Sequence, residues 1–222
     1  IFVFDGKPPQ EKNDTILQRR CDRKQAKERY AELLSLIDNG NNLTKYSSEL
    51  QRLKRSIVSI KDADICKVKS LMDHYGVQYI SCDGEADGIC AQLVKSNKAD
   101  YCLSDDTDMF MYNCPNILRN ISLLHHTVIE YNTTNVFSEL NMTYDEFCEV
   151  MILSGTDYNN NVLDLNILMT EFYKYKKNIL ETGSKISFVI WLTQSNYEID
   201  THIVSTITNL FHSKDDECNN IV

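Results

Sequence analysis

Short apolar runs separated by helical stretches constrain the fold of this chain more than any other feature of its sequence. The runs cover Ile1–Phe4, Val77–Ser81 and Ala99–Leu103, and each is bounded by polar or turn-forming residues. We therefore expect a buried strand at each of them. Strands that alternate with helices pair mostly in parallel. The sequence thus predicts an α/β chain with a parallel-rich twisted sheet that has helices on both faces.

Helical periodicity fills the segments between and after these strands. Asp62–Tyr75 carries apolar residues at helical spacing and ends before Gly76, and Tyr144–Leu153 is followed by a stop at Gly155. Further helices are expected from Asp14 to Ile37, from the turn at Asn39–Asn42 to Ile60, and from Ala86 to Val94. Beyond residue 160 the pattern is helical but weak. We expect a core at residues 1–158, a helical insertion at 12–60, and a divergent helical region at 159–222.

The charge of the chain is unevenly distributed. The formal net charge of −9 argues against a protein that coats nucleic acid without specificity, yet Lys12–Arg29 alone carries +4. Its basic residues recur at helical spacing, in the sets Arg20, Lys24, Lys27 and Arg19, Arg23. Like charges at this spacing destabilise an isolated helix by roughly a few tenths of a kcal/mol per pair. The pattern fits either a solvated helix face or a surface that binds a polyanion.

Cysteine usage and hydropathy bound the class of protein. The eight cysteines are scattered, with no Cys-x-x-Cys pair, which argues against a zinc site. We expect reduced thiols, several of them in the core, in an intracellular protein. No run of about 18 apolar residues is present, so we expect no membrane span.

Six acidic residues follow predicted strands or a predicted helix stop. They are Asp5, Glu85, Asp87, Asp106, Asp108 and Asp157. Open α/β sheets place their functional sites just past the carboxyl ends of strands. Acidic residues also cap helices and stabilise turns, and this structural role is the interpretation we prefer for Asp83, as a helix N-cap, and for Asp105.

Carboxylates that converge at one sheet edge repel one another, and a divalent cation relieves that repulsion. Hard oxygen ligands favour Mg²⁺ or Mn²⁺ over Zn²⁺. Two such ions can activate water and stabilise the leaving oxygen of a phosphodiester. The residues alone leave this metal site and a set of unrelated caps as alternatives.

Four motifs resemble those of the flap endonuclease family. They are Phe2-Val-Phe-Asp-Gly-Lys-Pro-Pro-Gln10, Gly84-Glu-Ala-Asp-Gly-Ile-Cys-Ala-Gln-Leu-Val-Lys95, Ser104-Asp-Asp-Thr-Asp108 and Leu153-Ser-Gly-Thr-Asp-Tyr158. They are similar to the family's Asp-Gly-Lys-Pro-Pro, Glu-Ala-Glu-Ala, Asp-x-Asp and Leu-Gly-Ser-Asp-Tyr motifs. Their order and spacing match from Ile1 to Tyr158, and the resemblance implies a PIN-like 5′ nuclease fold.

The resemblance also assigns roles to residues. It implies two Mg²⁺ ions, which Mn²⁺ can replace, held by the six acidic residues named above. Asp87 stands where most relatives have Glu, so we expect it to reach its ion through water. Lys12 and Arg19 are implied to contact the scissile phosphate at the base of a helical arch over residues 12–60. With that arch beside the carboxylates, we expect the basic helix to bind nucleic acid through Arg20, Arg23, Lys24 and Lys27.

The sequence departs from the family in two places. Relatives carry a further aspartate on an earlier strand, and because Ile1 opens directly on an apolar run, we expect a segment to precede this sequence. Relatives also follow their Gly-Ser-Asp-Tyr with a glycine hairpin that grips duplex DNA. The corresponding segment here, Asn159–Asn166, contains no glycine. Duplex binding by that device is therefore not expected.

The resemblance predicts a Mg²⁺-dependent, structure-specific 5′ nuclease that hydrolyses phosphodiesters in DNA near a 5′ flap or end, as in replication or repair. Its partner would be branched or 5′-ended DNA, or RNA, and we expect a monomer with no membrane contact and no visible sliding-clamp motif. One alternative is a 5′→3′ exoribonuclease, although Pro8-Pro9 and the Lys12 to Arg19 spacing are more similar to the flap enzymes. Another is a catalytically inert nucleic-acid or protein docking module.

Overall fold

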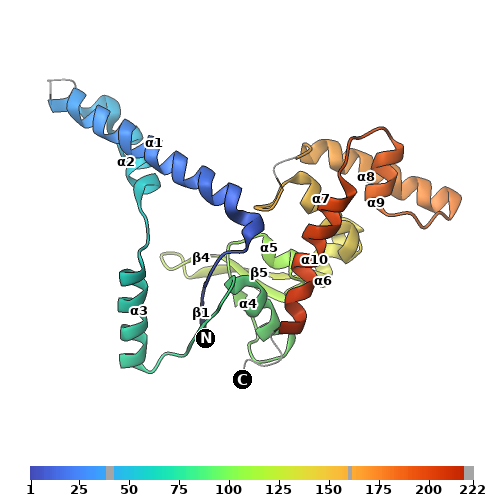
Figure 1. Cartoon of the computed structure of the whole chain (residues 1–222). Helices are drawn as coiled ribbons and strands as arrows, with labels where there is room; N and C mark the ends of the chain where they lie inside the picture. Colours follow the sequence, from blue (N-terminus) through green and yellow to red (C-terminus); the bar gives the residue numbers. More distant parts are fainter. Residues whose placement is uncertain (39–42, 160–161, 218–222) are drawn as a thin grey trace. The chain divides into compact units, whose positions relative to one another are not determined.

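The computed structural model describes residues 1–38, 43–159 and 162–217, and its fold is mixed α/β, as predicted (Figure 1). The chain divides into two compact units. The first comprises residues 1–2 and 8–80, and the second comprises residues 3–7 and 81–222. Each unit is described by itself below.

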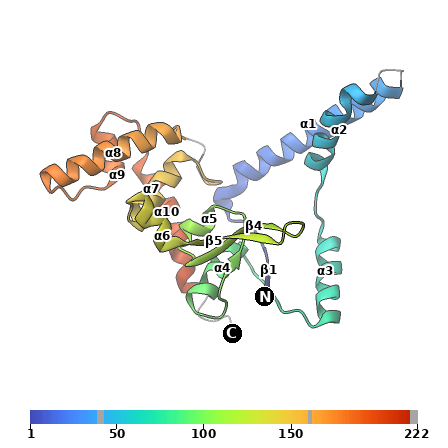
Figure 2. The same ribbon diagram turned by 180° about the vertical axis from the view of Figure 1, so that it is seen from behind.

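A helical pair dominates the first unit. A 3-10 turn, η1 (Gln10–Lys12), leads into the long helix α1 (Asn13–Asp38), which lies beside α2 (Leu43–Ile57) (Figures 1 and 2). The pair has a small core of its own, centred on Ala26, Leu33 and Leu53. The prediction that the second helix reaches Ile60 was wrong, because the helix ends at Ile57 and Ile60 is exposed. The expected turn at 39–42 lies outside the described residues.

The next helix, α3 (Asp62–Tyr75), confirms its predicted bounds. Asp64 accepts a hydrogen bond from the Lys61 backbone N–H at 3.1 Å and so closes the first turn. Gly76 ends the helix in the left-handed conformation with φ of 64°, which glycine adopts without steric cost. Local sequence signals determine both ends of this helix.

Among the residues that the structure describes, the strands form two small sheets, where one was expected. β1 (Phe2–Phe4) pairs with β2 (Tyr79–Ser81), and β3 (Cys102–Leu103) pairs in parallel with β4 (Asn116–Ser122). β4 continues antiparallel to β5 (Thr127–Asn132), a hairpin that the apolar pattern did not predict (Figure 2). The expected burial of the first strand was wrong at its start. Ile1 and Phe2 are more than half exposed, because the described residues pair β1 with β2 alone.

Helices complete the second unit. Their bounds are α4 (Ala86–Lys95), α5 (Asp108–Met111), α6 (Thr133–Leu140), α7 (Tyr144–Ser154), α8 (Leu165–Thr182), α9 (Phe188–Gln194) and α10 (Thr201–Glu217). One core runs through the unit, from Met109 and Ile117 near the sheet to Phe172 and Phe188 in the carboxyl-terminal helices. Helix α10 packs against both α4 and α7. The carboxyl-terminal helices therefore share the core that supports the strand ends.

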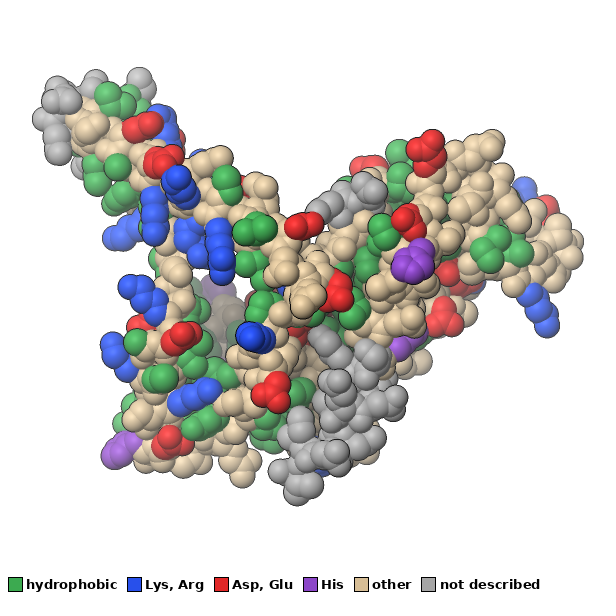
Figure 3. Space-filling model, viewed as in Figure 1, with side chains coloured by type: hydrophobic (Ala, Val, Ile, Leu, Met, Phe, Trp, Pro, Cys, Tyr) green, Lys and Arg blue, Asp and Glu red, His purple; other side chains and the backbone are tan. Residues whose placement is uncertain are grey.

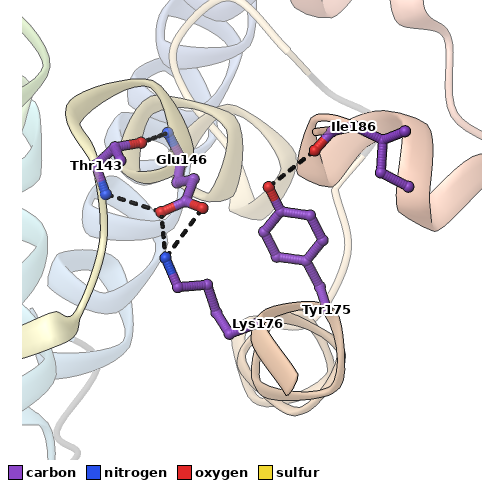
Figure 4. Close-up of polar contacts among 5 residues, drawn as sticks. All are labelled: Thr143, Glu146, Tyr175, Lys176 and Ile186. Atoms are coloured by element: carbon purple, nitrogen blue, oxygen red, sulfur yellow. Dashed lines mark hydrogen bonds and ion pairs between the residues drawn. The ribbon is translucent and has the colours of Figure 1, made fainter. Parts of the chain in front are cut away.

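A polar clamp joins α7 to α8 (Figure 4). Thr143 and Glu146 cap the start of α7 reciprocally, with the Thr143 N–H donating to Glu146 at 2.8 Å. Lys176 on α8 donates to both oxygens of the same carboxylate, at 2.9 and 3.1 Å. Nearby on α8, the Tyr175 hydroxyl donates to the Ile186 carbonyl at 3.1 Å. These contacts anchor the divergent helical region to the rest of the core.

The cysteines that the structure describes are all thiols, with none in a disulfide. Cys102 and Cys148 are buried in the core, as the apolar runs around them predicted. Cys21 and Cys66 are exposed. In the described ranges, every helix is too short or too polar to cross a bilayer.

Candidate active site

The first acidic residue lies where β1 meets the start of α4. Asp5 follows β1, and its carboxylate accepts a hydrogen bond from the Ala86 N–H at 2.7 Å, at the first position of α4. An anion is favoured at a helix N-terminus because unsatisfied N–H groups and the helix dipole point toward it. The prediction that Asp83 caps this helix was therefore wrong. Glu85 is the N-cap residue, and the capping bond that the structure shows is donated by Ala86 to Asp5, which follows β1.

The backbone explains why Asp5 takes this role. Gly6 and Lys7 donate their N–H groups to the carbonyls of Gly84 and Asp83, at 2.7 and 2.8 Å. These bonds hold the end of β1 against the loop before α4. A Cβ atom at Gly6 would lie 2.1 Å from the Cys82 carbonyl oxygen, so only glycine permits the approach. In the Asp-Gly pair after β1, Asp5 thus supplies the carboxylate, and Gly6 allows the close backbone approach that brings it to α4.

A second group of acids follows β3. The Asp106 carboxylate accepts a hydrogen bond from the Asp108 N–H at 2.9 Å, so both residues lie at the start of α5. The structural role predicted for Asp105 is confirmed. Its carboxylate accepts from the Asn120 N–H at 2.7 Å and ties the turn to β4.

Two tyrosines connect the acidic groups. The Tyr158 hydroxyl donates to Oε2 of Glu85, and the hydroxyls of Tyr112 and Tyr158 are hydrogen-bonded to each other. Burial raises the pKa of Tyr112, and the negative charges of Glu85, Asp87 and Asp108 raise it further. Carboxylates from α4 and α5 therefore act on one buried hydroxyl.

A thiol on α4 is also influenced by two of the acids. The pKa of Cys90 is raised, first by its hydrogen bond to Cys102, then by burial, and also by the charges of Asp87 and Asp5. Asp5 and Asp87 consequently belong to the same acidic region as Glu85 and Asp108. Asp157 immediately precedes Tyr158 in the chain.

The donor chemistry of this region fits a hard divalent cation, because all six predicted ligands present carboxylate oxygens. Their side chains are not grouped as a preformed cage. In the ranges that the structure describes, no three His, Cys, Asp or Glu side chains are arranged to hold one ion. Asp5, Asp106 and Glu85 instead accept hydrogen bonds from Ala86, Asp108 and Tyr158. The structure thus supports an acidic pole, defined here as Asp5, Glu85, Asp87, Asp106 and Asp108.

The predicted nucleic-acid residues lie in the first unit. Lys12 ends η1, and α1 carries the others, namely Arg19, Arg20, Arg23, Lys24 and Lys27. Basic side chains gather along the α1–α2 pair (Figure 3). Sequence order alone does not show which of them share a cavity.

A cavity of about 360 Å³ opens between α1 and α2. Arg19, Arg23 and Arg52 line it, together with Asp22 and Ser56. The Nε atom of Arg23 is buried and has no hydrogen-bond partner among the described residues. A buried donor beside two other guanidinium groups calls for an anionic acceptor. This feature we name the arginine cavity.

Sequence reasoning missed three residues that shape these sites. Tyr158 closes the Leu-Ser-Gly-Thr-Asp-Tyr motif, and Tyr112 follows Asp108 by one helical turn, so both had a positional signal. Arg52 lies on α2 and lines the arginine cavity only because α2 packs beside α1. No local pattern in the sequence could have paired Arg52 with Arg23.

Comparison with known proteins agrees with the motifs. The XPG I-region family model matches residues 76–157. Flap endonuclease 1 of Glycine max is 33% identical over 166 residues, covering 73% of this chain and 41% of that protein. Flap endonuclease 1 of Methanococcus aeolicus is 31% identical over 159 residues, covering 72% and 46%. The chain spans less than half the length of these curated relatives.

Solved structures support the same fold. The catalytic core of Rad2 in complex with DNA substrate has a TM-score of 0.62 at 21% identity, covering 95% of this chain and 64% of that one. Flap endonuclease-1 from Methanococcus jannaschii has a TM-score of 0.50 at 17% identity, covering 98% and 76%. The fold is that of the PIN-like nucleases. Within that class, the chain belongs to the XPG and flap endonuclease family.

Proposed function

We propose that this chain carries the catalytic part of a structure-specific nuclease that hydrolyses phosphodiesters in DNA near a 5′ flap or a free 5′ end. The observation that carries the proposal is the acidic pole, where Asp5 accepts from the first N–H of α4 and Glu85, the N-cap of α4, accepts from Tyr158. Carboxylates brought near one another repel, and a bound cation would relieve that repulsion. Family membership supports the reaction class, and the replication or repair role is part of the same proposal.

Two Mg²⁺ ions, replaceable by Mn²⁺, would be held by the acidic pole together with Asp157. When bound, such ions lower the pKa of water and neutralise charge on the leaving oxygen. The chain itself supplies the ligands and their orientation. The Asp5 bond to α4 and the Asp106 bond to α5 fix two of the carboxylates relative to their helices.

The arginine cavity provides the contact for the nucleic acid. Arg19, Arg23 and Arg52 offer guanidinium forks that match a phosphate group in two-point geometry. An anion there would satisfy the buried Nε of Arg23. Single-stranded phosphodiester backbone, as in a 5′ flap, presents such groups without a duplex around them. Lys12 and Arg19 are proposed to contact the scissile phosphate.

Cleavage of matched substrates tests the proposal. The full-length protein is incubated with labelled 5′-flap DNA and with an RNA of the same shape, in Mg²⁺ or in EDTA. We expect cleavage of the DNA near the flap base with Mg²⁺ and none with EDTA. Asp87→Asn and Asp108→Asn should each lower the rate by at least about 100-fold, because one carboxylate of the pole is lost.

Asp83→Asn is the matched control. Asp83 lies four residues before Asp87 and is exposed, and the acidic pole does not include it. We expect its rate to stay within about twofold of wild type, as for surface positions in general. Cleavage that persists in EDTA, or equal losses in the Asp83 and Asp87 variants, would contradict the proposal. Preferential cleavage of the RNA would instead indicate an exoribonuclease-type activity.

A docking module without catalysis is the second candidate. One observation favours it: among the described residues, no three potential ligand side chains are arranged around one ion position. The same assay separates the two candidates. Tight binding of flap DNA with no cleavage in Mg²⁺ or Mn²⁺ would support the docking module.

A further inference from the structure

We propose that Tyr112 and Tyr158 are positioning residues, whose paired hydroxyls fix the orientation of the Glu85 carboxylate. The inference deepens the proposed function, and rests on it, in that Glu85 would act as a ligand of the acidic pole. The contacts that carry it all lie in the second unit. Tyr158 follows α7, Tyr112 ends α5, and Glu85 caps α4, so the pair joins three segments that are distant in sequence.

The direction of the hydrogen bonds follows from donor and acceptor chemistry. An ionised carboxylate only accepts, so Tyr158 donates its single hydroxyl proton to Oε2 of Glu85. The bond between the two hydroxyls must then be donated by Tyr112. The result is a relay from Tyr112 through Tyr158 to Glu85. Hydrogen bonds in such a chain polarise and strengthen one another.

The carboxyl-terminal helix holds the relay in place. Phe211 on α10 is buried, and its ring lies 4.9 Å from the Tyr112 ring and 5.7 Å from the Tyr158 ring. The Tyr158 contact is edge-on, with an interplanar angle of 86°. One phenylalanine therefore contacts both members of the pair, and α10 also packs against α4, which begins beside Glu85. The divergent helical region thereby takes part in shaping the acidic pole.

The relay fixes the plane of the Glu85 carboxylate before any cation is bound. A carboxylate whose plane is already fixed loses less orientational entropy when it binds a cation. Residues that hydrogen-bond to a metal ligand raise metal affinity in this way.

Two measurements on the full-length protein test the relay. The first is the crystal structure of Tyr158→Phe without added metal, compared with wild type. We expect the Glu85 carboxylate to rotate away from its wild-type position. The second is Mn²⁺ binding by isothermal titration calorimetry. We expect Tyr158→Phe to weaken binding by about 10- to 100-fold, and Tyr112→Phe to weaken it less, because its hydroxyl acts through Tyr158.

Tyr175→Phe is the matched control. Tyr175 is also buried and also donates a hydroxyl hydrogen bond, to the Ile186 carbonyl at 3.1 Å, but it does not contact Glu85. Its Mn²⁺ affinity should equal that of wild type. In a Glu85→Gln background, Tyr158→Phe should add little further loss, because the group it positions is gone.

The two proposals fail in distinguishable ways. A Glu85 carboxylate that keeps its position in Tyr158→Phe, or an equal loss of Mn²⁺ affinity in Tyr158→Phe and Tyr175→Phe, overturns the positioning role. Wild-type protein that binds no Mn²⁺ overturns the metal-dependent function instead. In that case the metal-free crystal structures still decide whether the tyrosine pair orients Glu85.

Discussion

The clamp between α7 and α8 gives the sharpest test of how the carboxyl-terminal helices are held. Lys176 donates to Glu146 at 2.9 and 3.1 Å, and the side chains are 23% and 11% exposed. Replacing Lys176 with Met keeps most of the aliphatic stem and its packing but removes the charge. Glu146 would then keep its Thr143 hydrogen bonds and lose its counter-charge.

The expected magnitude follows from burial. Exposed pairs contribute about 0.2–1 kcal/mol, whereas removing one partner of a fully buried pair costs about 3–5 kcal/mol. The Lys176–Glu146 pair lies between these limits, and Lys176 also lies 5.5 Å from the centre of the Phe172 ring. We expect Lys176→Met to lower the free energy of unfolding by about 2 kcal/mol, roughly a 4–8 °C drop in Tm for a chain of this size.

Thermal and urea unfolding followed by circular dichroism would measure both quantities. Lys177→Met is the control, because Lys177 is the next residue on α8 and pairs with Glu181 at 3.8 Å, with side chains 77% and 63% exposed. It should cost no more than about 0.5 kcal/mol. Equal losses in the two lysine variants would refute the argument that burial sets the strength of the clamp.

Three further predictions concern the site and its surroundings. Gly6→Ala should destabilise the protein by about 1–3 kcal/mol, since its Cβ would lie 2.1 Å from the Cys82 carbonyl oxygen, and an unchanged Tm would contradict this. Burial raises the pKa of Glu149 above its ordinary 4.5. The protonated side chain therefore contributes its full stabilisation below pH 4.5, and this stabilisation is lost as the pH rises through the raised pKa. Urea titrations across that pH range should show that the free energy of unfolding of wild type declines, and Glu149→Gln should remove this decline. Parallel curves of unfolding free energy against pH for the two proteins would contradict the prediction. Arg52→Ala should reduce the slope of log binding constant against log salt concentration for single-stranded DNA by about 0.7. Arg29→Ala should change that slope less, because Arg29 is already ion-paired with Glu32 and Glu49. Equal slopes for the two variants would exclude Arg52 as a phosphate contact.

Local sequence signals were enough to predict many of the helices. The bounds of α3 could be predicted because the apolar spacing and Gly76 lie within one segment. The same holds for α7, where a Thr143–Glu146 capping box and Gly155 mark the two ends. The hairpin of β4 and β5 could not, since its strands are stabilised by their pairing with each other and with β3.

The candidate site shows the same division. The acidic residues could be predicted from their positions after strands and from the motifs. Their hydrogen-bond partners could not, because Asp5 reaches α4 across 81 positions of sequence and Tyr158 reaches Glu85 across 73. The prediction that Asp83 caps α4 was wrong because the backbone bonds at Gly6 bring Asp5 to the start of α4, and closeness in sequence does not show this.

The arginine cavity shows the same limit of sequence-based prediction in the first unit. Helical spacing identified a basic face on α1, but not which of its residues face α2. The packing of Leu33 and Leu53 determines how the two helices meet, and so places Arg52 with Arg23. A one-helix pattern does not contain that information.

Diffraction from crystals soaked in Mn²⁺ tests the central claim most directly, because the anomalous signal locates the ion itself. The account predicts a peak among the carboxylates of Glu85, Asp87 and Asp108, and its disappearance in Asp87→Asn crystals. Well-ordered crystals with no peak there at millimolar Mn²⁺, or with a peak only at a distant surface, would contradict it.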